Sequence, residues 1–296
     1  MMRSFAGLLV CLTIGATANG QKEDEVITVD SSIVVLNAAI SDAAGKPVPG
    51  LNQNQFKVFE DGKEQAISFF QAEETPFAAV ILIDTSGSME QRVSLARSAA
   101  IKFLDGLRTE DNSEIYTFDS KVNLLQDFSN QRDVTDKLFD IKANGMTTLN
   151  DAIYQAAADL SKRTEKRRAI IVLSDGEDTY SKKSADKAIR AALAVDATIY
   201  TVDMSSTDTG GARRQQNQGI LKSFAEKTGG FFVSTPGGEA MRNAFQRIVS
   251  ELGSQYTLGY QPPNSSKDGK WHALEIRVSR PNLTIRTRKG YNAAAK

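Results

Sequence analysis

Residues 79–89 read Ala-Val-Ile-Leu-Ile-Asp-Thr-Ser-Gly-Ser-Met. The five apolar residues at the start of this stretch predict a β-strand that is buried on both faces. Helical spacing of apolar residues begins after Met89, so residues 84–88 are predicted to form a strand-to-helix loop. The carboxylate and the two hydroxyls of this loop suit a hard cation such as Mg²⁺, whereas zinc favours His and Cys. The stretch therefore predicts a cation site.

The composition around this stretch is that of a globular protein with balanced charge. The chain has 296 residues, of which 41% are hydrophobic, enough for one large domain or a medium domain with a small companion. Lys plus Arg and Asp plus Glu both number 36, and neither sign forms a long run. Nucleic acid and acidic membrane surfaces are therefore not expected as partners.

The first twenty residues have the layout of a secretory signal peptide. A basic residue precedes the apolar stretch 5–14, and the small residues 16–18 follow. About ten apolar residues are too few for a membrane anchor, which needs roughly twenty. The only cysteine, Cys11, lies in this segment, so the mature chain is predicted to contain no disulfide. With no second apolar stretch long enough to cross a membrane, we expect export to the periplasm or the extracellular space.

The remaining chain divides into three parts by its periodicity. Residues 24–75 and 254–292 show the alternation typical of antiparallel strands, whereas residues 76–253 alternate apolar strands with amphipathic helices. The central part predicts an α/β fold with a doubly wound, mostly parallel sheet covered by helices on both sides. Each β segment alone is too small for a stable core, so we expect the two ends of the chain to form one small β-sandwich with the α/β domain inserted between them.

Three loops of the α/β part are predicted to converge. In a sheet ordered 3-2-1-4-5, Asp84 and Asp175 end neighbouring strands at the point where the winding direction reverses, which is where such sheets bind ligands. The loop 145–149, which opens a helix predicted over 148–162, adds a further hydroxyl. The candidate metal ligands are Asp84, Ser86, Ser88, Thr147 and Asp175.

These elements resemble the von Willebrand factor type A domain and its metal-ion-dependent adhesion site. Asp84-x-Ser86-x-Ser88, Thr147 and Asp175-Gly176 match the motif in order, and the resemblance covers about residues 76–252. The family often has Gly-Gly-Thr where this chain has Gly145-Met146-Thr147, so Thr148 stays open as the alternative ligand. The flanking β segments resemble those of secreted bacterial proteins that carry such a domain.

The resemblance implies a binding function. In that family the serines and the threonine reach the cation directly, the aspartates act directly or through water, and one position is left for a carboxylate from a partner. Neutral hydroxyls donate little charge, so an ion held in this way still seeks an anion. We therefore expect a non-enzymatic module that binds Mg²⁺, or Mn²⁺ or Ca²⁺ in its place, and a partner protein that offers an Asp or Glu side chain.

Four further residues are candidates for the rim of this site. Arg213 and Arg214 lie in a predicted loop, Met204–Gln218, which follows the strand 197–202; they either attract an acidic ligand or are ordinary solvated residues. Asp119 and Asp178 either orient bound waters or cap a turn or helix.

The alternative function is a metal-dependent or serine hydrolase that uses the same strand end. A serine hydrolase needs a base, yet the only histidine is His272 in the terminal β region, and the chain has no Gly-x-Ser-x-Gly motif. An aspartyl phosphatase usually has a second acid two residues after its nucleophile, where this chain has Ser86. A third alternative keeps the fold as an assembly scaffold without the metal.

Overall fold

A computed structural model of the chain describes residues 33–72, 74–132, 136, 138, 141–205, 211–234, 238–262 and 268–293. The predicted signal peptide over residues 1–20, with Cys11, lies outside these residues. Within the part that is described, no helix combines the length and the apolar character needed to cross a bilayer.

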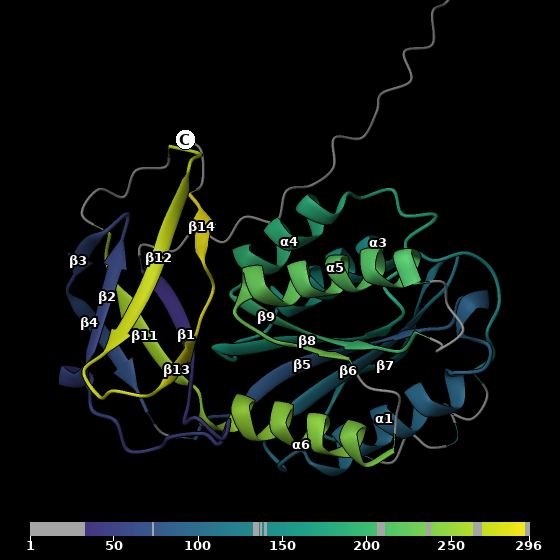
Figure 1. The fold of residues 1–296 in the computed structure, drawn as a ribbon, viewed down its shortest axis with the longest axis horizontal. Helices are drawn as coiled ribbons and strands as arrows, with labels where there is room; N and C mark the ends of the chain where they lie inside the picture. Colours follow the sequence, from purple (N-terminus) through teal and green to yellow (C-terminus); the bar gives the residue numbers. More distant parts are fainter. Residues whose placement is uncertain are drawn as a thin grey trace, which may run out of the picture.

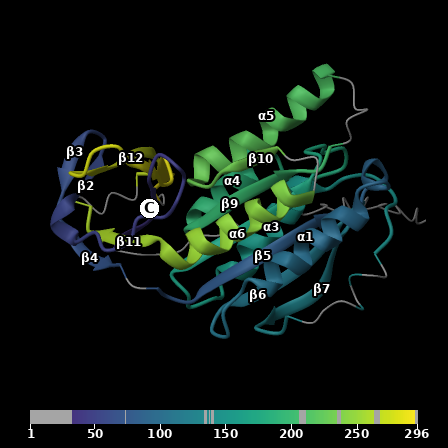
Figure 2. The ribbon, with the colours of Figure 1, turned by 60° about the horizontal axis from the view of Figure 1, so that its bottom comes forward.

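The central domain is built on a six-stranded sheet in the order β10-β9-β8-β5-β6-β7 (Figures 1 and 2). All neighbouring strands are parallel except β6 and β7. Strand β5 lies between β8 and β6, which is the arrangement that the predicted metal site requires. The strands are β5 (Phe77–Asp84), β6 (Asn112–Phe118), β7 (Val122–Ser129), β8 (Arg167–Ser174), β9 (Ala197–Asp203) and β10 (Phe232–Ser234).

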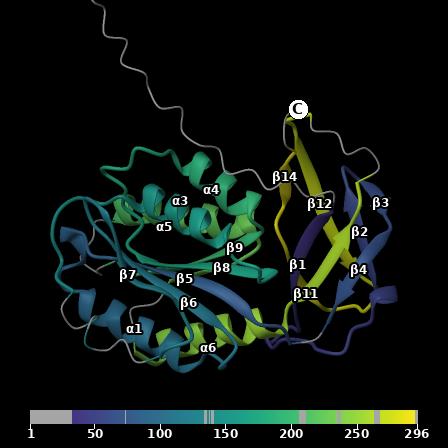
Figure 3. The ribbon, with the colours of Figure 1, turned by 180° about the vertical axis from the view of Figure 1, so that it is seen from behind.

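Helices cover both faces of this sheet (Figures 1 and 3). Alternate side chains of β5 enter two separate apolar cores, one packed against α1 and α6 and the other against α3, α4 and α5. Every residue of β5 is buried, as its continuous apolar sequence predicts. The helices are α1 (Val93–Asp105), α3 (Leu149–Leu160), α4 (Ala185–Ala194), α5 (Gly211–Thr228) and α6 (Gly238–Ser254).

Two elements differ from the sequence expectation. The segment Met204–Gln218 is not a loop throughout, because α5 begins at Gly211 and carries Arg213 and Arg214. Most of the first ten residues of α5 are exposed, so this part of the helix has no apolar stripe to reveal it. Strand β7 lies at the antiparallel edge of the sheet and exposes Asn123, Leu124 and Asp127, so it lacks the apolar run of a central strand.

The two ends of the chain meet in a β-sandwich of two four-stranded antiparallel sheets, β13-β1-β11-β4 and β14-β12-β2-β3 (Figures 1 and 2). Each sheet pairs an N-terminal with a C-terminal strand, β1 with β11 and β2 with β12, and the inner faces share one apolar core. The predicted fold class, including this sandwich, is confirmed. Its strands are β1 (Val34–Ser41), β2 (Phe56–Glu60), β3 (Lys63–Gln65), β4 (Ile67–Gln71), β11 (Tyr256–Tyr260), β12 (Trp271–Val278), β13 (Thr284–Arg286) and β14 (Gly290–Asn292).

A buried arginine joins the central domain to the sandwich. Arg167, the first residue of β8, is fully buried. Its guanidinium donates hydrogen bonds to the carbonyls of Leu252 (3.3 Å), Gly253 (2.8 Å) and Gln255. These carbonyls belong to the end of α6 and to the residue before β11, where the backbone has no intrahelical donors. Arg167 therefore caps α6 at the point where the chain leaves the central domain.

Glu114 on β6 is expected to make folding stability depend on pH. Its side chain is buried, and Oε2 has no hydrogen-bond partner among the residues that the structure describes. Burial, followed by the charges of Asp159 and Asp127, raises its pKa to about 8. A carboxyl whose folded pKa is raised stabilises the fold when protonated, and this stability is lost as the pH rises from about 4.5 to 8. Glu114→Gln should therefore remove at least about 2 kcal/mol of the decrease in unfolding free energy over that range.

Urea unfolding at pH 5 and pH 9, with a chelator present, measures this difference. Glu90→Gln is the matched control, because Glu90 is exposed. An unchanged pH dependence in Glu114→Gln would show that the carboxyl titrates alike in the folded and unfolded chain.

Candidate metal centre at the carboxyl edge of the central sheet

The first loop of the site follows β5. Asp84 is the last residue of this strand and is fully buried. Its Oδ1 accepts hydrogen bonds from the backbone N–H (2.9 Å) and the hydroxyl (2.6 Å) of Ser86. The Ser86 and Ser88 hydroxyl oxygens lie 3.2 Å apart, and Ser88 is exposed. The loop thus presents one carboxylate and two hydroxyls together, the second of them at the surface.

The second loop follows β8, the strand that pairs with β5. The Ser174 hydroxyl donates to Asp84 Oδ2 at 2.5 Å and accepts from the backbone N–H of Gly176 at 3.0 Å. Asp175, the next residue, is 8% exposed, and its charge contributes to a raised pKa of Asp84. Ser174 was not among the predicted site residues. Its position at the end of the apolar strand, directly before Asp175, was the signal that could have identified it.

The third loop is held against both others by backbone hydrogen bonds. The N–H of Gly87 donates to the carbonyl of Gly145 at 3.1 Å. The carbonyl of Thr147 accepts from Thr179 (3.0 Å) and Tyr180 (2.9 Å), which follow β8. Thr147 is 2% exposed. The structure therefore brings together the three loops that carry the predicted ligands.

The hydroxyls of Thr147 and Thr148 differ in their surroundings. Thr148 Oγ1 donates to the carbonyl of Asp119 at 2.8 Å and so ties the start of α3 to the end of β6. This contact directs the Thr148 hydroxyl toward the chain that follows β6. Of the two threonines, Thr147 is the one whose backbone is hydrogen-bonded to the loop after β8.

Gly176 is required by the shape of the second loop. Its φ is +82°, in the left-handed region that glycine adopts most readily. A Cβ at this position would lie 2.7 Å from the carbonyl oxygen of Asn217 in α5. The glycine after Asp175 therefore allows α5 to pack closely behind the site.

The carboxylate of Asp84 is buried, and burial disfavours its charged form. Burial, and next the nearby charge of Asp175, raise the pKa of Asp84 to about 7, against the opposing effect of its hydrogen bonds from Ser174 and Ser86. Among the residues that the structure describes, no Lys or Arg forms an ion pair with Asp84. A buried carboxylate normally pairs with a cation or a metal. The donor set of two carboxylates and hydroxyls fits an oxygen-seeking ion such as Mg²⁺.

The predicted rim residues lie around these loops with partners of their own. Asp119 Oδ1 accepts from the N–H of Lys121 at 2.9 Å, a turn cap. Asp178 caps the start of α3 by accepting from the N–H of Asn150 at 2.8 Å. Two ion pairs complete the rim: Arg213 with Glu177, and Arg214 Nη2 with Asp203 Oδ2 at 3.9 Å.

The hydrolase alternative finds no support in the placement of His272. This residue lies on β12 in the sandwich, where its ring contacts Asp61 and Asp268. The Ser86 hydroxyl donates to Asp84 instead of to an imidazole. Ser86 is therefore not paired with the only histidine of the chain, which is the base of a Ser-His pair.

Comparison with known proteins agrees with this fold. Residues 79–177 match the von Willebrand factor type A domain family. Over 126 residues the chain is 27% identical to the inter-alpha-trypsin inhibitor heavy chain H3 of Bos taurus, and this match covers 38% of this chain and 14% of that protein. Over 183 residues it is 25% identical to an uncharacterized protein of Synechocystis, and this match covers 58% of this chain and 42% of that protein. The chain thus spans less than half the length of either relative.

A solved structure is also similar. It is an aerotolerance-related membrane protein from Bacteroides fragilis with multiple mutations to serine, at a TM-score of 0.50 and 18% identity, covering 60% of this chain and 98% of that one. At this identity the likeness concerns the fold alone. The α/β part of the chain therefore has the fold of a von Willebrand factor type A domain, and residues 79–177 match that family, as the motifs predict.

Proposed function

We propose that the chain is an exported, non-enzymatic protein-binding module that works in adhesion or envelope assembly. A divalent cation, Mg²⁺ or a similar ion, is held by Asp84, Ser86, Ser88, Thr147 and Asp175 and bridges to an acidic side chain of a partner protein. The observation that carries this proposal is the fully buried carboxylate of Asp84, which lies beside the Ser86 and Ser88 hydroxyls without a cationic partner among the described residues.

The type of donor explains why the cation would still bind a partner. Two shared carboxylates and three neutral hydroxyls leave the ion electron-poor, so a carboxylate from outside completes its coordination. Ser88 is exposed, which puts the open side of the site at the surface. We assign the third hydroxyl to Thr147, because the Thr148 hydroxyl is directed to the carbonyl of Asp119.

Two exposed apolar side chains next to Thr147 indicate what surrounds the partner's carboxylate. Met146 is 47% exposed and Tyr180 is 52% exposed. Met146 precedes Thr147 in the chain, and the backbone of Tyr180 is hydrogen-bonded to the Thr147 carbonyl at 2.9 Å. Large exposed apolar residues beside a polar site are typical of protein interfaces. The partner is therefore expected to offer an Asp or Glu flanked by apolar residues.

Chelation tests the proposed function directly. The immobilised chain should capture its partner from an envelope extract in the presence of Mg²⁺, release it when EDTA is added, and bind it again when Mg²⁺ is restored. A short acidic peptide in excess should compete, because it occupies the same coordination position. Capture that is unaffected by both EDTA and the acidic peptide would contradict a metal-bridged carboxylate.

Replacing Met146 and Tyr180 with Ser should weaken binding of the partner and leave binding of the metal unchanged. Buried apolar interface residues contribute about 1–2 kcal/mol each, so the affinity for the partner should fall by at least about tenfold, while the affinity for Mg²⁺ is unchanged. Titration calorimetry with each ligand measures the two affinities. Ile33→Ser is the control, since Ile33 is 41% exposed and lies in the sandwich. Equal partner affinity in both variants would exclude an apolar rim.

A further inference from the structure

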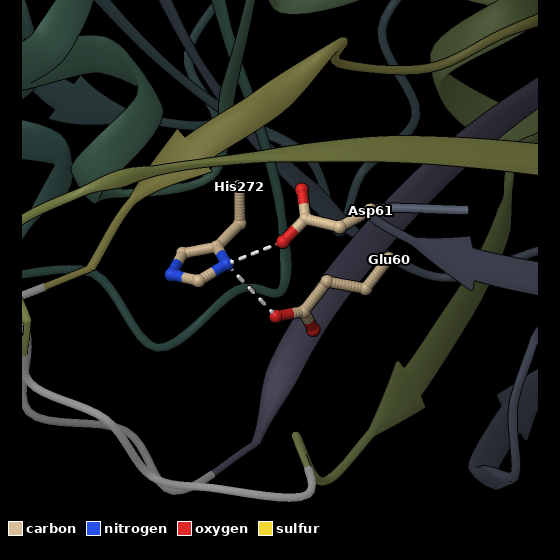
Figure 4. Close-up of side chains that lie close together, drawn as sticks. All are labelled: Glu60, Asp61 and His272. Carbon is tan, nitrogen blue, oxygen red and sulfur yellow. Dashed lines mark hydrogen bonds and ion pairs between the residues drawn. The ribbon is translucent and has the colours of Figure 1, made fainter. Parts of the chain in front are cut away.

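A second group of metal-binding side chains lies in the β-sandwich, on strands that come from opposite ends of the chain (Figure 4). His272 Nδ1 lies 2.9 Å from Asp61 Oδ2 and 3.3 Å from Glu60 Oε1. One ligand atom from each of the three residues falls within 4.8 Å of the others. This group shares no residue with the site at the carboxyl edge of the central sheet and does not depend on the function proposed for that site.

The fold holds these three side chains in place before any ligand binds. Glu60 ends β2 and pairs with Leu274 of β12, two residues after His272. Asp61 lies in the turn between β2 and β3 with a φ of +48°. Its backbone N–H donates to the Ala273 carbonyl, and its Oδ1 accepts from the Ala273 N–H, both at 2.9 Å. The second carboxylate oxygen of Asp61 is thereby aimed at the imidazole.

The spacing of the donor atoms fits a tetrahedral metal ion. Zinc binds His nitrogen and carboxylate oxygen at about 2.0–2.2 Å, so adjacent ligand atoms lie about 3.3 Å apart around it. The observed separations of Nδ1 from the two carboxylate oxygens, 2.9 and 3.3 Å, are close to this edge length. The ligand atoms that the three residues offer all lie within 4.8 Å of one another.

The neighbours of the three residues form the supporting contacts that metal sites usually have. A histidine ligand normally gives its other ring nitrogen to a carboxylate, and His272 Nε2 lies 3.3 Å from Asp268 Oδ1. The Tyr260 hydroxyl donates to Glu60 Oε2, and the Tyr291 ring is stacked on the imidazole with centroids 5.4 Å apart. The imidazole orientation and one oxygen of Glu60 are thus fixed from outside the cluster.

The charge of the cluster favours a cation. Glu60 is only 8% exposed, and among the described residues His272 is the only basic side chain within ion-pair distance of Glu60 or Asp61. A divalent cation neutralises both carboxylates, whereas one protonated imidazole neutralises only one.

We infer that Glu60, Asp61 and His272 bind a zinc ion, with a water completing its coordination. A His nitrogen together with carboxylates favours zinc over Mg²⁺, which takes oxygen ligands. The ion joins residues 60 and 61 to residue 272, and so ties together the two chain segments that flank the inserted domain. Its role would be to stabilise the sandwich.

The experiment uses the fact that His272 is the only histidine in the chain. The protein used is the whole chain without an affinity tag, with Asp84→Asn to remove the other site. Its imidazole proton signals in NMR then come from this cluster alone. One equivalent of Zn²⁺ should shift these signals, whereas Mg²⁺ should not. Zinc should also raise the melting temperature by mass action, and His272→Gln should abolish this rise.

Matched variants separate a metal site from an acidic surface. Asp61→Asn keeps a residue that tolerates the left-handed backbone and still accepts from Ala273, but it removes the charge, so zinc affinity should fall by at least about tenfold. Asp268→Asn should lower the zinc affinity by about 10- to 100-fold, because Asp268 contacts the other ring nitrogen of His272. Glu275→Gln removes an exposed carboxylate of the same strand that pairs with Arg277, and it should have no effect. Unshifted His272 signals at stoichiometric zinc, or equal zinc affinity in Asp61→Asn and Glu275→Gln, would overturn the inference.

Discussion

Replacing Asp84 with Asn is expected to abolish binding of Mg²⁺ and of the partner while the domain stays folded. The amide has nearly the same volume, and the Ser174 hydroxyl can accept from it as readily as it donates to the carboxylate. The lost charge is the buried negative charge that holds the cation. Because changes outside the ligand set already cost about 10- to 100-fold in metal affinity, loss of this ligand should cost more than about 100-fold.

The same substitution should stabilise the metal-free protein. Burial raises the pKa of Asp84 from 3.8 to about 7, so the folded state binds the proton more tightly than the unfolded state. The unfolding free energy therefore falls as the pH rises from about 4 to 7. At pH 8 in EDTA, Asp84→Asn should be more stable than the natural chain by about 2–4 kcal/mol, and Mg²⁺ should stabilise only the natural chain.

Calorimetry with Mg²⁺ and urea unfolding at pH 8, with and without EDTA, measure both effects. Asp105→Asn is the control, because Asp105 is an exposed residue of α1 that pairs with Lys102. Undiminished Mg²⁺ affinity in a folded Asp84→Asn variant would show that the ion binds elsewhere.

Replacing Arg167 with Met should destabilise the whole chain by about 3–5 kcal/mol. Met fills much of the same space, but it leaves the carbonyls of Leu252, Gly253 and Gln255 without their donor in a buried place. Burial lowers the pKa of Arg167 only to about 10, so the guanidinium is charged at neutral pH and its hydrogen bonds are strong. The hydrogen bonds that are lost all lie at the junction of α6 and β11.

Urea unfolding at neutral pH measures this loss against Arg190→Met, an exposed position of α4 where the change should stay within about 0.5 kcal/mol. Arg167→Lys should be intermediate, because an ammonium cannot reach three carbonyls in the plane of a guanidinium. A loss below about 1 kcal/mol in Arg167→Met would mean that water replaces the missing donor.

The predictable features were those that follow from local pattern or from the order of parallel strands. The apolar run before Asp84 predicts a strand buried on both faces, and β5 contributes to both cores of the domain. Ligands bind where the winding direction of such a sheet reverses, and this rule predicts that the carboxyl ends of β5 and β8 lie close together. Ser174 at the end of β8 confirms this by donating a hydrogen bond to Asp84 at the end of β5.

Features that depend on tertiary contacts were not predictable. Strand β7 and the first half of α5 present polar residues to solvent, so neither has the apolar period that identifies an element. The different roles of the two threonines follow from the contact of Thr148 with Asp119, 29 positions away. The group of Glu60, Asp61 and His272 joins residues more than 200 positions apart, and no local signal marks it.

The most direct test of the central claim is anomalous diffraction from crystals of the chain soaked with Mn²⁺, which replaces Mg²⁺ and scatters anomalously. The account predicts one strong peak at the carboxyl edge of the central sheet, bounded by oxygens of Asp84, Ser86, Ser88, Thr147 and Asp175, with a ligand position open to solvent. Bound manganese that lies away from these three loops, with no peak beside Asp84, would contradict it.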